Sequence, residues 1–260
     1  MENSLARPHT RIKIAILSGV VITLLGGASL LWVYFRGGFA APEKDKNALL
    51  AELQKHLDAQ HLDSMAFAVV KKGTLVTSGA LGFSNKLLKI PATSDTRYMV
   101  ASISKTITTV ALMQLVEQNR IALDDDINQF LPFSVRNPSF PNTKITYRML
   151  LSHTSSISDD YQNPLDLYCY GTDCAQSLEQ FFADVFTSNG AYNSPLNFSN
   201  HEPGTNEDYS NLGAALIGYL VERIAQVPFD VYCKNQIFLP LGMNKTEWRL
   251  ANCPLNELAI

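Results

Sequence analysis

The chain has 260 residues, of which 46% are hydrophobic and 17% charged, so it is long enough to bury the core of one or two domains. Its formal net charge of -3 gives no electrostatic case for a nucleic-acid partner, and the sequence has no Gly-rich phosphate loop. None of its 5 histidines stands in an H-E-x-x-H pattern or pairs with cysteines at zinc spacing. This argues against a metallo-hydrolase, and we expect neither a metal nor a cofactor.

The first segment predicts a membrane anchor. Residues 14–35 are 22 uncharged positions, which make about 33 Å of helix. Three basic residues precede this segment, whereas only Arg36 follows it closely. We therefore expect 1–13 in the cytoplasm, a single-pass signal-anchor at 14–35, a linker at 36–46, and the remaining chain on the periplasmic, extracellular or lumenal side. A cleaved signal peptide is the alternative, although Phe39 is bulky where a signal peptidase needs a small residue.

Apolar periodicity and turn residues predict the elements that follow. Leucines at helical spacing indicate a first helix, and two β-rich runs separated by Lys71-Lys72-Gly73 indicate a hairpin that leads into a loop. An apolar-periodic helix comes next. The first helix is expected at 47–62, the two strands of the hairpin at 66–70 and 74–81, the loop at 82–96 and the next helix at 103–119.

The second half of the chain reads as helical or irregular. Asp124-Asp125-Asp126 resembles a helix-start cluster, which we expect to be a solvated cap rather than a metal site. Cys169 and Cys174 flank a short loop, and the sequence leaves open whether they form a disulfide or stay free thiols. Further helices are expected at 145–151, 177–187, 211–225 and 229–239.

Ser102 and Lys105 form the first candidate catalytic pair. Ser102 stands at the start of the predicted helix, where free backbone N–H groups favour an oxyanion, and one helical turn brings Lys105 over the same face. The pair would supply a hydroxyl nucleophile with a nitrogen base beside it. A capping serine with a solvent-facing lysine gives the same pattern, so corroboration has to come from elsewhere in the chain.

Tyr209 and Asn211 supply that corroboration. They precede a strongly apolar helix on one loop, and their side chains point together if the loop is extended. A phenol can relay a proton, and an asparagine amide can orient a substrate carbonyl. A second Tyr-x-Asn, Tyr161-Gln162-Asn163, lacks the following helix.

These segments together resemble the serine β-lactamase and penicillin-binding-protein superfamily, closest to its class C, DD-peptidase and family VIII esterase branch. The resemblance covers about 47–250 and rests on the order of its motifs. These are Ala101–Thr106, Leu123–Asp126, Ile145–Ser155, Pro203–Gly213 and Phe238–Met243. It implies a β-lactamase/transpeptidase-like α/β (α+β) fold for 47–260 and gives His153 a structural place.

The resemblance also implies roles in acyl transfer. Ser102 would attack a carbonyl with Lys105 as general base, and its backbone N–H would form half of an oxyanion hole. Tyr209 would carry the proton to the leaving group and later help activate water, and Asn211 would orient the substrate. Because the assignment of the base is disputed in such enzymes, Lys105 and Tyr209 are treated as one coupled unit.

One departure from the family pattern affects the expected activity. The family's third motif, Lys or His followed by Thr or Ser and Gly, does not occur between Trp248 and Ile260. We therefore expect a chain whose C-terminal strands are missing and which by itself is weakly active or inactive. The sequence predicts a membrane-anchored serine hydrolase acting on a β-lactam, a peptidoglycan peptide or a short ester. The alternatives are an inactive binding protein that keeps the fold and an unrelated anchored helical domain; the oligomeric state stays open.

Overall fold

The computed structural model describes residues 43–159 and 169–260. The predicted anchor over 14–35 and the stretch 1–13 lie outside the described residues. Within the described ranges no single helix is long and apolar enough to cross a membrane. Two consecutive helices, α5 (Asn211–Ala225) and Phe229–Phe238, together reach the necessary length and apolar composition, but the chain bends by 81° between them. The chain divides into two compact units, 1–49 and 50–260.

Within the part of the chain that the structure describes, the sheet has three antiparallel strands in the order β1-β2-β3. As expected from the sequence, β1 (Ser64–Lys71) and β2 (Thr74–Asn85) form a hairpin, and its turn residues Lys72 and Gly73 have φ values of +48° and +75°. Positive φ at both positions suits the right-handed twist of paired strands. The helix before the hairpin, α1 (Glu43–Ala59), starts four residues earlier than the expected 47.

The expected loop at 82–96 is wrong over its first half, because β2 continues to Asn85 and β3 (Ile90–Pro91) pairs with it. The glycines that read as loop signals are instead used for close approach inside the sheet. A Cβ on Gly79 would lie 3.0 Å from the Phe67 ring. At Gly82, whose φ is +76°, a Cβ would lie 2.2 Å from a backbone oxygen. Gly82 therefore has no room for a larger residue, whereas at Gly79 the Phe67 ring would have to shift.

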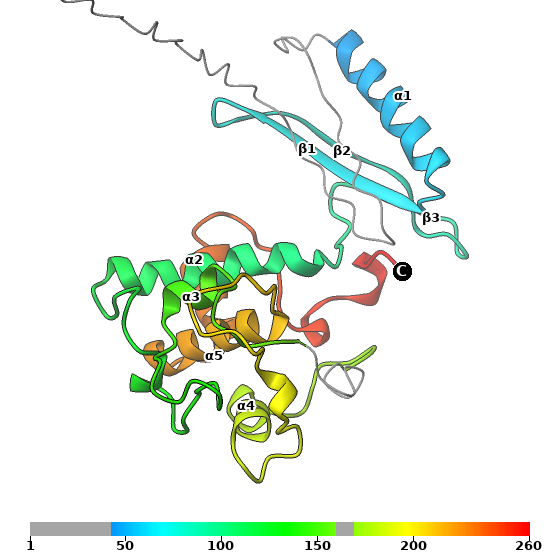
Figure 1. Ribbon diagram of the computed structural model, residues 1–260. Helices are drawn as coiled ribbons and strands as arrows, with labels where there is room; N and C mark the ends of the chain where they lie inside the picture. Colours follow the sequence, from blue (N-terminus) through cyan, green and yellow to red (C-terminus); the bar gives the residue numbers. More distant parts are fainter. Residues whose placement is uncertain (1–42, 160–168) are drawn as a thin grey trace, which may run out of the picture. The chain divides into compact units, whose positions relative to one another are not determined.

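The helical core is built around α5, which packs against α2 (Ser104–Glu117), α3 (Tyr147–Leu151), α4 (Leu178–Phe186) and α6 (Phe229–Cys233) (Figure 1). Leu216 and Leu220 of α5 and Leu112 and Leu115 of α2 are fully buried. Because α2 and α5 both begin close to the candidate residues, this core positions the site.

Most helix bounds agree with the periodicity of the sequence. The helix expected at 211–225 is confirmed at its full length, and the one expected at 177–187 is α4 with Ser177 and Thr187 as its two caps. The helix expected at 103–119 is preceded by a 3₁₀ turn, and the one expected at 229–239 changes to a π turn after α6. The remaining short turns are η1 (Ala101–Ile103), η2 (Ile127–Gln129), η4 (Pro195–Asn197), η5 (Lys234–Phe238), η6 (Leu250–Asn252) and η7 (Leu255–Glu257).

The aspartate cluster caps a helix start, as expected. Asp126 is the N-cap of η2, accepts from the backbone N–H of Asn128 at 3.0 Å and pairs with Arg136. Asp124 forms a two-point ion pair with the guanidinium of Arg148, at 2.8 Å for each contact. Asp124 and Asp126 therefore have local structural partners.

Cys169 and Cys174 form a disulfide, which settles the alternative that the sequence left open. The loop that this disulfide closes is also held to η6. The Asp173 carboxylate accepts from the backbone N–H groups of Leu250 at 2.7 Å and Ala251 at 3.0 Å, and these bonds hold its pKa below the usual value. The loop and the C-terminal segment thus stabilise each other.

The packing of α2 gives a direct test of the core. We expect Leu112→Ala to lower the free energy of unfolding by about 2–5 kcal/mol, because it opens a cavity at a side chain with no exposure. Val110→Ala on the same helix, where the side chain is 43% exposed, should cost about 0.5 kcal/mol or less. Urea unfolding of both variants measures the difference, and equal losses would contradict this description of the core.

Candidate active site

Ser102 lies in η1, the single 3₁₀ turn that leads directly into α2. The residue before it, Ala101, has a φ of +44°, in the left-handed region. Such a conformation costs an L-residue other than glycine about 1–2 kcal/mol. The chain thus bends sharply before Ser102, whose side chain is exposed rather than packed against the helix.

All four residues predicted from the sequence come together. The Lys105 Nζ donates to the Ser102 Oγ at 3.2 Å and to the Asn211 Oδ1 at 2.6 Å. The Tyr209 hydroxyl donates to the same Ser102 Oγ at 3.0 Å, and the Lys105 Nζ lies 4.8 Å from the centre of the Tyr209 ring. One hydroxyl therefore has two groups within hydrogen-bond distance that can exchange protons with it. The second Tyr-x-Asn, at 161–163, lies outside the described residues.

The electrostatics of the site act on the Tyr209 phenol. Its partial burial acts to raise its pKa, but the neighbouring Lys105 ammonium and the hydrogen bond to Ser102 act in the other direction and prevail. The pKa of Tyr209 therefore lies below its usual value of 10.0. A more acidic phenol releases its proton more readily, which suits a group that passes a proton to a leaving group.

His153 positions the loop that carries Tyr209. Its backbone oxygen accepts from the Asp208 N–H at 2.7 Å, and its ring Nδ1 accepts from the Ser210 N–H at 3.2 Å. The imidazole also lies against the Tyr209 ring, with centroids 4.5 Å apart. His153 therefore has the structural place expected for it. Because Nδ1 can accept a hydrogen bond only in the neutral ring, these contacts favour the neutral form of His153.

Asp159 is the residue of the site that sequence reasoning missed. Its carboxylate accepts hydrogen bonds from the Ser210 hydroxyl, from the Asn211 backbone and side-chain amides and from the Leu212 backbone. The only signal in the sequence is an acidic residue shortly after His153, and nothing local indicates a partner 52 residues away. The Asn211 amide is consequently engaged at both ends, by Lys105 and by Asp159.

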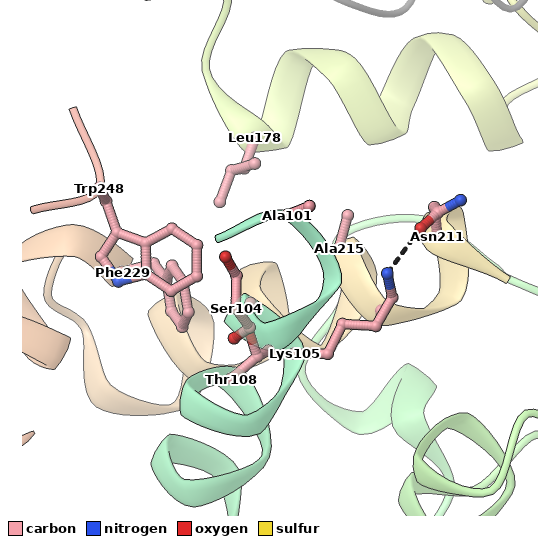
Figure 2. Close-up of a pocket in the computed structure, with 11 residues that line it drawn as sticks. Ala101, Ser104, Lys105, Thr108, Leu178, Asn211, Ala215, Phe229 and Trp248 are labelled. Carbon is pink, nitrogen blue, oxygen red and sulfur yellow. Dashed lines mark hydrogen bonds between the residues drawn. The ribbon is translucent and has the colours of Figure 1, made fainter. Parts of the chain in front are cut away.

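A pocket of about 280 Å³ adjoins the site on the far side of Lys105. Figure 2 shows Lys105 turned toward Asn211, whereas Ser104 and Thr108 point toward Phe229 and Trp248. The walls are mostly apolar, and the small residues of α5 that line the pocket keep it open. The nucleophile candidate does not line it, so the pocket lies beside the reacting groups.

Comparisons with known proteins identify the family. Residues 49–253 match the family model Beta-lactamase. Protein flp of Staphylococcus aureus (strain N315) is 25% identical over 200 residues, which are 77% of this chain and 38% of that protein. The structure of an octameric penicillin-binding protein homologue from Pyrococcus abyssi matches with a TM-score of 0.63 and 26% identity, over 77% of this chain and 44% of that one.

A D-amino acid amidase from Ochrobactrum anthropi SV3 shares the fold, with a TM-score of 0.64 and 24% identity over 82% of this chain and 55% of that one. The family match and the structural match define the class by its fold, which is β-lactamase/transpeptidase-like α/β. The chain belongs to the β-lactamase family, within the superfamily of serine β-lactamases and penicillin-binding proteins. It spans about two fifths of the length of protein flp.

The role of His153 predicts a pH dependence of stability. Burial and the Lys105 charge hold the pKa of His153 below its usual value of 6.5 in the folded chain. The unfolded chain therefore binds this proton more tightly than the folded chain does. The contribution of the neutral His153 ring to the free energy of unfolding is complete above the ordinary pKa and is lost as the pH falls through the lowered pKa of the folded chain. His153→Ala should show a smaller drop in Tm than the wild type between about pH 7.5 and about pH 5.5.

His201→Ala, at an exposed histidine, is the matched control and should keep the wild-type pH dependence. A His153→Ala variant that loses as much Tm as the wild type over this interval would show that His153 does not contribute the effect.

Proposed function

We propose that the chain carries the nucleophile of a serine hydrolase that acts on an amide or ester through an acyl-enzyme. The observation that carries the proposal is the Ser102 Oγ, which lies 3.2 Å from the Lys105 Nζ and 3.0 Å from the Tyr209 hydroxyl. A weak nucleophile needs a neighbouring group that removes its proton. Two such groups on one exposed hydroxyl favour activation over a purely structural serine.

In the proposed reaction the Ser102 Oγ attacks the substrate carbonyl carbon while its proton passes to the coupled unit of Lys105 and Tyr209, which has to give up one proton before it can act as the base. The tetrahedral intermediate then collapses, and the bond to the amine or alcohol leaving group breaks as that group takes a proton from Tyr209. Water attacks the Ser102 ester and gives up its proton to the same unit. The bond between the Ser102 Oγ and the acyl carbon then breaks, the acid leaves, and the Ser102 oxygen takes back a proton from the Lys105–Tyr209 unit.

For the substrate we propose a β-lactam, a peptidoglycan stem peptide or a short ester. The names of two similar structures support this range, since one is a penicillin-binding protein homologue and the other is an amidase for D-amino acids. Penicillin and the amides of D-amino acids, the compounds in these two names, both contain an amide bond. The apolar pocket beside Lys105 supports a substrate with an apolar group.

For the location we propose a single-pass anchor at residues 14–35 with the hydrolase domain on the periplasmic, extracellular or lumenal side. The uncharged segment and the basic residues before it support this orientation. The disulfide between Cys169 and Cys174 supports an oxidising compartment.

The nucleophile can be tested by covalent labelling. We expect a fluorophosphonate or a penicillin to add one mass equivalent to the wild-type chain and none to Ser102→Ala, because the adduct forms on that oxygen. Lys105→Met and Tyr209→Phe should slow labelling by about 100–10,000-fold, since each removes a proton-handling group. Intact-mass spectrometry over time measures the adduct.

Ser134→Ala, at an exposed serine, serves as the control and should label like the wild type. Labelling that persists in Ser102→Ala would remove Ser102 from its role. A wild-type chain that is stabilised by penicillin without any gain in mass would point instead to a binding protein that keeps the fold.

The anchor can be tested separately. We expect the full chain to stay with membranes after alkaline carbonate extraction and a variant lacking residues 1–42 to be released, because only the first has an apolar span of about 33 Å. The intact mass of the membrane form decides between an anchor and a cleaved signal. A full chain that carbonate releases would overturn the anchor.

A further inference from the structure

The carboxylate of Asp159 lies at the start of α5, where it accepts hydrogen bonds from three consecutive residues. Its Oδ1 accepts from the Ser210 hydroxyl and the Leu212 backbone N–H, both at 2.9 Å. Its Oδ2 accepts from the Asn211 backbone N–H at 2.6 Å and from the Asn211 Nδ2 at 2.7 Å. Bonds of this length to an ionised acceptor are in the range of charge-assisted hydrogen bonds.

Capping alone does not account for these contacts. Ser210 is already the N-cap of α5, and its hydroxyl oxygen accepts from the Gly213 N–H at 2.8 Å. Asp159 adds a contact to a side chain, the Asn211 amide, which a helix cap does not need. That amide is the one that binds Lys105 at its other end.

An asparagine amide has an acceptor end and a donor end, and the two can exchange by a half-turn about the last side-chain bond. A carboxylate only accepts, so Asp159 binds the NH₂ end of Asn211 and leaves the oxygen facing Lys105. A flipped amide would present its NH₂ group to the Lys105 ammonium. The ammonium would then lose the acceptor that lies 2.6 Å away and the position that places it 3.2 Å from the Ser102 Oγ.

We propose that Asp159 is a positioning residue that fixes the orientation of the Asn211 amide and, through it, the place of Lys105 beside Ser102. The expected effect on the rate of Ser102 labelling rests on the proposed function. The expected effect on the orientation of the Asn211 amide rests on the hydrogen bonds alone. The hydrogen bonds of Asp159 go to Ser210, Asn211 and Leu212 rather than to the nucleophile or to the groups that exchange protons with it.

The charge of Asp159 acts on the same neighbourhood. It opposes the Lys105 ammonium at Tyr209 and, together with Glu207, at His153, because a nearby carboxylate raises the pKa of both groups where the ammonium lowers it. Removing the charge should therefore lower the pKa of Tyr209 further, so that the phenol ionises at a lower pH.

The kinetic test is a double-mutant cycle on the rate of Ser102 labelling by a fluorophosphonate. Asp159→Ala and Asn211→Ala should each slow labelling by about 10–100-fold, because a small displacement of the base suffices for such a loss. The double variant should label within about threefold of Asn211→Ala alone, since Asp159 acts through Asn211. Losses that multiply in the double variant would overturn the proposal.

Ser210→Ala is the matched control. It removes the helix cap and one bond to Asp159 while leaving both bonds of the Asn211 amide in place. We expect it to lower the Tm and to keep the labelling rate within about threefold of the wild type. A rate loss in Ser210→Ala as large as that in Asp159→Ala would mean that Asp159 acts only as a structural cap.

A second readout does not depend on catalysis. The ¹⁵N-labelled Asn211 NH₂ group should show downfield, exchange-protected proton signals in the wild type and lose both features in Asp159→Ala. If the wild type is never labelled at Ser102, the proposed function fails, and these signals still decide the role of Asp159. Signals that stay unchanged in a folded Asp159→Ala would overturn the positioning role.

Asp159→Asn covers the case in which Asp159→Ala does not fold, because its amide has the size of the carboxylate and keeps one acceptor oxygen. The bond to the Asn211 NH₂ group becomes neutral and weaker, so labelling should slow by about threefold or more and the NH₂ signals should move upfield. Wild-type rate and signals in this variant would equally overturn the proposal.

Discussion

The hydrogen bond between the Lys105 Nζ and the Asn211 Oδ1, 2.6 Å long, joins the first turns of α2 and α5. An ammonium beside an apolar pocket needs polar partners, and the structure supplies the Asn211 oxygen, the Ser102 hydroxyl and the face of the Tyr209 ring. Because the two helices share one buried core, the partners meet without a flexible segment between them. The site therefore depends on the packing of α2 against α5.

Each helix start is also held by a local device. Before α2, the left-handed Ala101 turns the backbone directly ahead of the exposed Ser102. Before α5, His153 binds the backbone on both sides of Tyr209. A strained residue persists only where its surroundings hold it. The local cost at Ala101 is thus offset by the packing of the helix that follows it.

Local patterns predicted much of this arrangement. The apolar period placed α5 at 211–225, and Lys71-Lys72-Gly73 placed the hairpin turn, because both signals act over a few residues. The glycines of β2 misled the same reasoning. They allow the backbone to pass close to the Phe67 ring of β1 and to Asp63 just before β1, and such contacts between strands leave no local pattern in the sequence. Asp159 gave no signal for a related reason. Its partners lie more than 50 residues along the chain, and no spacing rule connects a loop carboxylate with a distant helix start.

The protonation states of the site follow from the same few charges. The Lys105 ammonium lowers the pKa of both Tyr209 and His153, which favours a more acidic phenol and a neutral imidazole. The imidazole has to be neutral, because its Nδ1 accepts from the backbone beside Tyr209. One cation therefore serves two needs, since it tunes the phenol and keeps the ring that positions the phenol in its accepting form. Losing its charge would change both the acidity of the phenol and the support of its loop.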